Sequence, residues 1–202
     1  MMKNNLYLFE LSDIFANQVY LPYSSGVVWS YCKAKPEVQQ NYILKNWFYY
    51  RQELKEILSQ IEDPNVVAFS CFMWNWNLNC EIAEYVKEHY PDCLVVFGGQ
   101  HQPLSDRNEK FFATHPYVDV LVHHEGEESF YEILMENLKP DPDFTQISGI
   151  TINLDGEELR TPPRPRMTDI ENVPSPYLDG SFDELLATNT KGLNYNTSVE
   201  SA

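Results

Sequence analysis

Short hydrophobic runs alternate with helix-like stretches through the middle of the chain. Residues 66–71, 94–97 and 118–122 are each hydrophobic at nearly every position and bounded by turn residues. A strand of this kind is typical of a parallel sheet that is covered on both faces. Two more strands are expected nearer the N-terminus, at residues 6–11 and 42–50.

Helical spacing of hydrophobic residues separates these strands. The clearest case is residues 53–61, where Leu54, Ile57, Leu58 and Ile61 are three or four positions apart. Helices are also expected at residues 24–34, from about 78 to 89, and around 130–138, with a short one capped by Ser105 that holds Phe111 and Phe112. Strands that alternate with helices predict an α/β fold with a doubly wound, five-stranded parallel sheet.

The pattern changes after Pro140. Two β-prone runs, 147–154 and 158–161, flank Asp155-Gly156, which is a strong hairpin signal. A proline-rich stretch, 161–167, follows as a stiff connector, and 182–186 is expected to form one helical turn. We therefore divide the chain into a Rossmann-like domain, residues 1–140, and a β-hairpin with a proline-rich linker, residues 141–202.

Composition narrows the possible partners. The chain of 202 residues has a formal net charge of −16, and its 14 basic residues are spread thinly, which disfavours nucleic acid and anionic membranes. It contains no apolar run long enough to span a membrane and no signal-peptide pattern, so a cytoplasmic location is expected. The four cysteines lack metal-site spacing and are expected to be reduced, buried thiols.

Ligands of open parallel sheets bind at the carboxyl ends of the strands. Three segments of this sequence follow predicted strands directly: residues 72–77, 98–103 and 123–127. Gly98 and Gly99 allow the backbone to approach a ligand closely, although a glycine pair also serves simply to turn the chain. Trp74 and Trp76 are suited to stacking on a flat ligand, and equally to plugging the end of the sheet.

Three histidines, His101, His123 and His124, are expected near the same edge. Because neighbours at a strand end point to opposite faces, His123 and His124 are unsuited to sharing one metal ion, and no metal site is predicted. The sequence has no Gly-x-Gly-x-x-Gly turn, no P-loop and no Gly-x-Ser-x-Gly elbow. It therefore predicts a binding domain with no catalytic residue of its own.

The order of these motifs resembles a known family. VVAFSCFMWNWN (66–77), FGGQHQP (97–103), VDVLVHHEGEESF (118–130) and LPYSSGVVWSYC (21–32) resemble the N-terminal cobalamin-binding domain of cobalamin-dependent radical SAM enzymes. ISGITINLDGEELRTPPRPR (147–166) and DIENVPSPYLDG (169–180) resemble the connection that leads to the radical SAM barrel. The resemblance covers nearly the whole chain.

The resemblance implies that the chain binds cobalamin. Cobalamin-binding domains often carry Asp-x-His-x-x-Gly after the first strand, and residues 12–26 hold no histidine, so the cofactor is expected to bind with its base detached. The expected cofactor-binding residues are Tyr23, Ser24, Ser70, Phe72, Trp74, Asn75, Trp76, Gly98, Gly99, Gln100, His101, Glu125, Gly126 and Glu127.

The rest of the family's chemistry is expected outside this sequence. The Cys-x-x-x-Cys-x-x-Cys motif for a 4Fe-4S cluster is absent from these 202 residues. The resemblance thus implies a fragment without catalysis, whose parent enzyme uses S-adenosylmethionine in methyl transfer or a related radical reaction. The alternative is a flavodoxin-like or receiver-like interaction module that binds no corrinoid.

Overall fold

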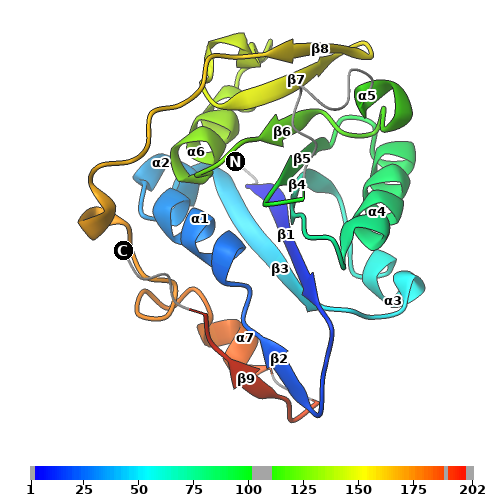
Figure 1. Ribbon diagram of the computed structural model, residues 1–202, viewed down its shortest axis with the longest axis vertical. Helices are drawn as coiled ribbons and strands as arrows, with labels where there is room; N and C mark the ends of the chain where they lie inside the picture. The colour runs from blue at the N-terminus through cyan, green and yellow to red at the C-terminus, as the bar shows by residue number, and fades with distance from the viewer. Residues whose placement is uncertain (1–2, 102–110, 189–190, 199–202) are drawn as a thin grey trace.

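A seven-stranded sheet forms the centre of the protein. The computed structural model describes residues 3–101, 111–188 and 191–198. The strand order is β3-β1-β4-β5-β6-β7-β8 (Figure 1). The strands are β1 (Asn4–Ser12), β3 (Tyr42–Tyr50), β4 (Pro64–Ser70), β5 (Leu94–Gly98), β6 (Val120–Val122), β7 (Ile150–Leu154) and β8 (Glu157–Arg160).

The five predicted parallel strands are confirmed. Each of β3, β1, β4, β5 and β6 pairs in parallel with its neighbour. The order reverses next to β1, because β3 lies on one side of it and β4 on the other. The predicted hairpin also forms, but β7 pairs antiparallel with β6 and extends the same sheet. The sheet therefore has seven strands, two more than expected, while the division at residue 140 stays a prediction.

Helices cover both faces of the sheet. One face carries α1 (Tyr23–Lys33), α2 (Pro36–Asn41) and α6 (Glu127–Glu136), and the other carries α3 (Leu54–Leu58), α4 (Trp76–His89) and α5 (Phe111–Thr114) (Figure 1). The predicted helices at 24–34 and 78–89 are confirmed almost to the residue. The helix expected over 53–61 is shorter and covers only Leu54–Leu58. Ser105, the predicted cap of a short helix, lies outside the described residues.

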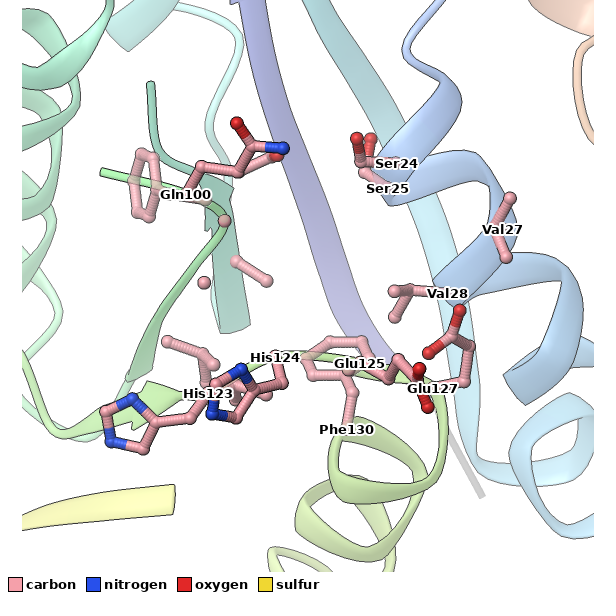
Figure 2. Close-up of a pocket in the computed structure, with 18 of the residues that line it drawn as sticks. Ser24, Ser25, Val27, Val28, Gln100, His123, His124, Glu125, Glu127 and Phe130 are labelled. Atoms are coloured by element: carbon pink, nitrogen blue, oxygen red, sulfur yellow. The ribbon is translucent and has the colours of Figure 1, made fainter. Parts of the chain in front are cut away.

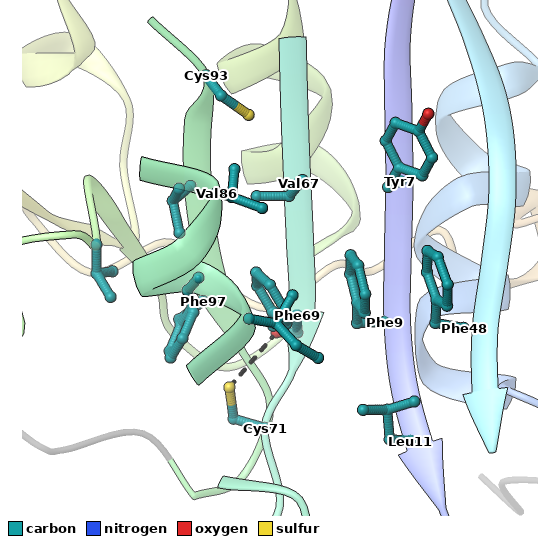
Figure 3. Close-up of a cluster of buried hydrophobic side chains, with 14 of the residues drawn as sticks. Tyr7, Phe9, Leu11, Phe48, Val67, Phe69, Cys71, Val86, Cys93 and Phe97 are labelled. Carbon is teal, nitrogen blue, oxygen red and sulfur yellow. Dashed lines mark hydrogen bonds between the residues drawn. The ribbon is translucent and has the colours of Figure 1, made fainter. Parts of the chain in front are cut away.

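A row of four phenylalanines crosses the sheet on the α4 side (Figure 3). Phe9 pairs in register with Phe48 and with Phe69, and Phe69 pairs with Phe97. The ring centroids of Phe9 lie 4.5 Å from those of both neighbours, and those of Phe69 and Phe97 lie 5.0 Å apart. All four side chains are buried, so the row fixes how β3, β1, β4 and β5 are aligned.

The last part of the chain returns to the first connection. Strand β9 (Asn194–Asn196) pairs in parallel with β2 (Gln18–Tyr20), and α7 (Asp183–Ala187) packs nearby around Phe182. A Cβ atom on Gly26 would lie 2.5 Å from the Phe182 ring, so this glycine lets the segment dock on α1. The sequence did not predict β2 and β9, because three polar-flanked residues carry no periodic signal.

Within the described residues, no helix is long and apolar enough to cross a membrane.

Candidate ligand-binding site

A cavity of about 1210 Å³ opens where the parallel strands end (Figure 2). Its lining comes from the ends of β4, β5 and β6, the first turns of α1 and α6, and the linker at residues 163–166. This is the edge of the sheet that the strand-end rule predicted, beside the point where the strand order reverses.

Small side chains form the floor of the cavity. Residues one position beyond the phenylalanine row point to the opposite face of the sheet, because side chains alternate along a strand. Ser70 and Gly98 are such residues, and they are direct cross-strand partners. Ala68 lies on the same side of β4 and also lines the cavity. The side chains on the floor between β4 and β5 are therefore short and leave room for a ligand.

Gly99 is required by the backbone at this edge. Its φ angle is +91°, and a Cβ atom there would lie 2.7 Å from the backbone nitrogen and oxygen of Cys71. The Cys71 amide donates to the Gly98 carbonyl at 2.8 Å, and the His101 amide donates to the Cys71 carbonyl at 3.0 Å. The glycine pair thus lets the loops after β4 and β5 touch.

The two tryptophans have different surroundings. Trp76 lines the cavity and meets the rings of His101 and His115 edge-on, with centroids 5.5 and 5.8 Å away. Trp74 is about half exposed, stacks on Phe72 with centroids 4.6 Å apart, and donates from Nε1 to the Leu11 carbonyl. Trp76 therefore presents an aromatic wall to a ligand, and Trp74 lies outside the lining.

Asn75 fixes the loop that follows β4. Its side chain is fully buried and accepts from the Phe72 amide at 2.8 Å. Its Nδ2 donates to the carbonyls of Ser70 and Leu11 at 3.0 and 3.2 Å. These bonds hold the loop after β4 against β1, and Asn75 does not line the cavity.

The α1 side of the cavity is built on a buried carboxylate. Tyr23, Ser24 and Ser25 line the cavity in the first turn of α1. Glu10 of β1 accepts from the Ser25 amide and hydroxyl at 2.7 and 2.8 Å, and from the Ser24 amide at 3.3 Å. Burial raises the pKa of Glu10 to about 7, although these hydrogen bonds oppose the shift. The carboxylate therefore caps α1 from another element.

The opposite side begins at the end of β6. His123 is buried, and its Nε2 lies 2.7 Å from Thr151 Oγ1 on β7. Burial lowers the pKa of His123 to about 4, so the imidazole is neutral at pH 7. His124 has a φ angle of +58°, a left-handed conformation that turns the chain toward Gly126 and α6. Both histidines line the cavity beside Glu125 (Figure 2).

The proline-rich part of the linker, residues 161–167, closes this side of the cavity, and we call it the strap. Arg164 donates to Ser129 Oγ at 2.9 Å and forms ion pairs with Glu128 and Glu132 on α6. The Met167 amide donates to Glu125 at 2.8 Å. The strap is thereby fixed to the start of α6, and Pro163 to Arg166 become part of the cavity wall.

Twelve of the fourteen expected binding residues line this one cavity, and Trp74 and Asn75 do not. Their contacts with a cofactor stay untested. Sequence reasoning missed several lining residues, which are Ser25, Val27, Val28, Phe111, His115, Phe130, Arg164 and Arg166. Glu10 carried a usable signal, since a charged residue stands inside the apolar run LYLFEL. The strap carried none, because a proline-rich segment does not reveal what it packs on.

The cysteines lie apart from this chemistry. All four are free, three are buried, and burial raises the pKa of the Cys93 thiol to about 12. Among the described residues, no cluster of histidine, cysteine or carboxylate side chains is arranged to hold a metal ion.

The fold and cavity define a Rossmann-like ligand-binding domain, and comparisons with known proteins specify it further. No family model matches the chain. It is 40% identical over 169 residues to 2-(S-pantetheinyl)-carbapenam-3-carboxylate methyltransferase of Streptantibioticus cattleyicolor, covering 84% of this chain and 24% of that protein. It is 36% identical over 177 residues to the cobalamin-dependent radical SAM methyltransferase TokK of Streptomyces tokunonensis, covering 87% and 26%.

A solved structure shows the same fold. The cobalamin-dependent S-adenosylmethionine radical enzyme OxsB, with aqua-cobalamin and S-adenosylmethionine bound, matches with a TM-score of 0.62 at 20% identity. The match covers 89% of this chain and 25% of that one. The chain spans about a quarter of the length of the curated relatives. The resemblance to one part of cobalamin-dependent radical SAM enzymes, predicted from the motifs, is confirmed.

Replacing Gly99 with alanine should destabilise the protein by about 1–3 kcal/mol, because its φ angle is positive and a Cβ atom would meet Cys71. Gly98→Ala is the matched control, since its nearest contact would be an ordinary 3.9 Å. Urea unfolding measures both. Equal stabilities of the two variants would contradict this account of the glycine pair.

Glu10 and His123 should give protein stability opposite dependences on pH. The pKa of Glu10 rises on folding from 4.5 to about 7, so its contribution is complete below pH 4.5 and lost as the pH rises through 7. The pKa of His123 falls from 6.5 to about 4, so its contribution is complete above pH 6.5 and lost as the pH falls through 4.

In the unmodified protein, the Glu10 side chain should lower the free energy of unfolding as the pH rises from about 5 to 7, and Glu10→Gln should remove this decrease. The His123 side chain should raise the free energy of unfolding as the pH rises from about 4 to 6.5, and His123→Gln should remove this increase. Urea unfolding across this range measures the slopes. A Glu10→Gln variant with the slope of the unmodified protein would show that Glu10 titrates normally in the folded state.

Proposed function

We propose that this chain binds cobalamin in the cavity at the carboxyl ends of its strands. The observation that carries the proposal is the floor of Ala68, Ser70 and Gly98 beneath a cavity of about 1210 Å³. Pockets for ordinary small ligands are about 300–1,000 Å³, so this one suits a larger cofactor. The similarity to TokK supports the same ligand.

The cavity residues fit such a cofactor by shape and polarity. Trp76 offers a flat wall beside a corrin, and the short side chain of Ser70 and the absence of one at Gly98 leave room over the sheet for the cofactor's tail. Gln100 and the Ser24 hydroxyl, in the first turn of α1, supply hydrogen-bonding groups for amide side chains. Cobalamin, when bound, supplies the cobalt chemistry, and the domain binds and orients it.

The base of the cofactor is proposed to be detached from cobalt. Residues 12–26, which would carry the histidine that takes its place in other domains, hold none. His101 and His115 lie on the cavity wall against Trp76, with ring contacts that account for their positions.

The longer enzyme is also a proposal. Because the chain spans about a quarter of its relatives' length, we infer that a radical SAM barrel with a 4Fe-4S cluster and S-adenosylmethionine completes it. Residues 141–202 then lead from the cobalamin domain, 1–140, to that barrel. Methyl transfer in the cytoplasm is the proposed activity of the whole.

The alternative is a flavodoxin-like or receiver-like module that binds no corrinoid. The order of the five parallel strands suits it equally, since that order also occurs in flavodoxin and CheY. However, Cys71 and Phe72 follow β4, where a receiver would carry its phosphorylated aspartate. A cavity of this size also exceeds what an interaction module needs.

Titration with hydroxocobalamin, followed by desalting and visible absorption, tests the proposal. We expect retained colour with a base-off spectrum. Trp76→Ala should weaken binding at least roughly tenfold, because the aromatic wall is lost, and Trp74→Ala should change it by less than about twofold.

Thermal unfolding of both variants serves as the control for folding. Failure of the folded, unmodified protein to retain cobalamin at any ratio would contradict the proposal for this chain. A loss confined to Trp74→Ala would place the ligand outside the cavity.

A further inference from the structure

The amino end of α1 lies where some open α/β domains hold a ligand phosphate. The order reverses beside β1, and α1 is the first helix after that strand. Free amide groups and the helix dipole make such an end attractive to anions. Here Ser24 and Ser25 of that turn also line the large cavity, so a ligand can reach it.

In this protein the chain's own carboxylate holds that position. Glu10 is only 9% exposed, and both of its oxygens accept hydrogen bonds from the first turn of α1. The Ser25 hydroxyl donates to the same carboxylate at 2.8 Å. The amides that would bind a phosphate are thus already occupied by the side chain of Glu10.

We propose that Glu10 is a specificity-determining residue that keeps ligand phosphates away from the amino end of α1. It acts through Ser24 and Ser25, by taking their amides and by repelling a second anion. The cavity then rejects nucleotides that anchor a phosphate at this turn, such as flavin mononucleotide. A ligand of this cavity has to present uncharged groups to α1 and place any phosphate elsewhere.

The connection from β1 to α1 agrees with this role. Residues 13–22 contain no glycine and include β2, whereas phosphate-binding turns rely on glycine for close backbone approach. The turn is therefore shaped by Glu10 and by the pairing of β2 with β9.

The test uses inorganic phosphate and flavin mononucleotide as probes, with no cobalamin present. Isothermal titration at about pH 8 measures affinity, and the amide resonances of Ser24 and Ser25 in ¹⁵N-labelled protein report the place of binding. Glu10→Ala should bind phosphate at least about tenfold more tightly than the unmodified protein, with both resonances shifting. Glu10→Gln keeps the shape without the charge and should gain at least about threefold.

Glu125→Gln is the matched control, because it removes the same charge from the cavity wall without vacating α1. It should gain less than about twofold. The proposal is wrong if the unmodified protein already shifts Ser24 and Ser25 with phosphate, or if Glu125→Gln gains as much as Glu10→Gln. It is also wrong if folded Glu10→Gln gains nothing, which decides the matter even where Glu10→Ala does not fold. Because the probes are not corrinoids, these outcomes are independent of cobalamin binding.

Discussion

The alignment of four strands by a single row of phenylalanines is the constraint on which the cavity depends. The row packs across β3, β1, β4 and β5 in direct register and consists of Phe48, Phe9, Phe69 and Phe97. A slip of one residue would turn every side chain of a strand to the other face. The same register therefore brings Ser70 and Gly98 together on the far side, so packing on one face determines the floor of the cavity on the other.

The walls of the cavity are held by polar contacts between elements. Glu10 holds α1, Asn75 holds the loop after β4, Thr151 holds His123, and Arg164 holds the strap. Glu10 and Thr151 come from a different element than the group that each one holds, whereas Asn75 and Arg164 tie their own segments to β1 and α6. A cavity supported in this way is preorganised, which lowers the ordering cost of binding.

Much of this arrangement could be predicted from local patterns, and the remainder could not for physical reasons. Runs such as VVAFSC and LVVF identify strands because burial on both faces demands hydrophobic residues throughout. The strand-end rule then locates the cavity. The difference between Trp74 and Trp76 depends on where α4 begins, and boundaries are the least readable feature of a sequence. The strap and the β2–β9 pair depend on contacts between distant segments, for which a single sequence has no local signal.

The pairing of β2 with β9 has a consequence for the order of folding during synthesis. Val19 meets Tyr195, so this parallel pair closes a loop of nearly the whole chain. The residues of the phenylalanine row have all been synthesised by position 97, well before β9 is made. The sheet can thus assemble before β2 pairs with β9, because long-range parallel pairs form slowly.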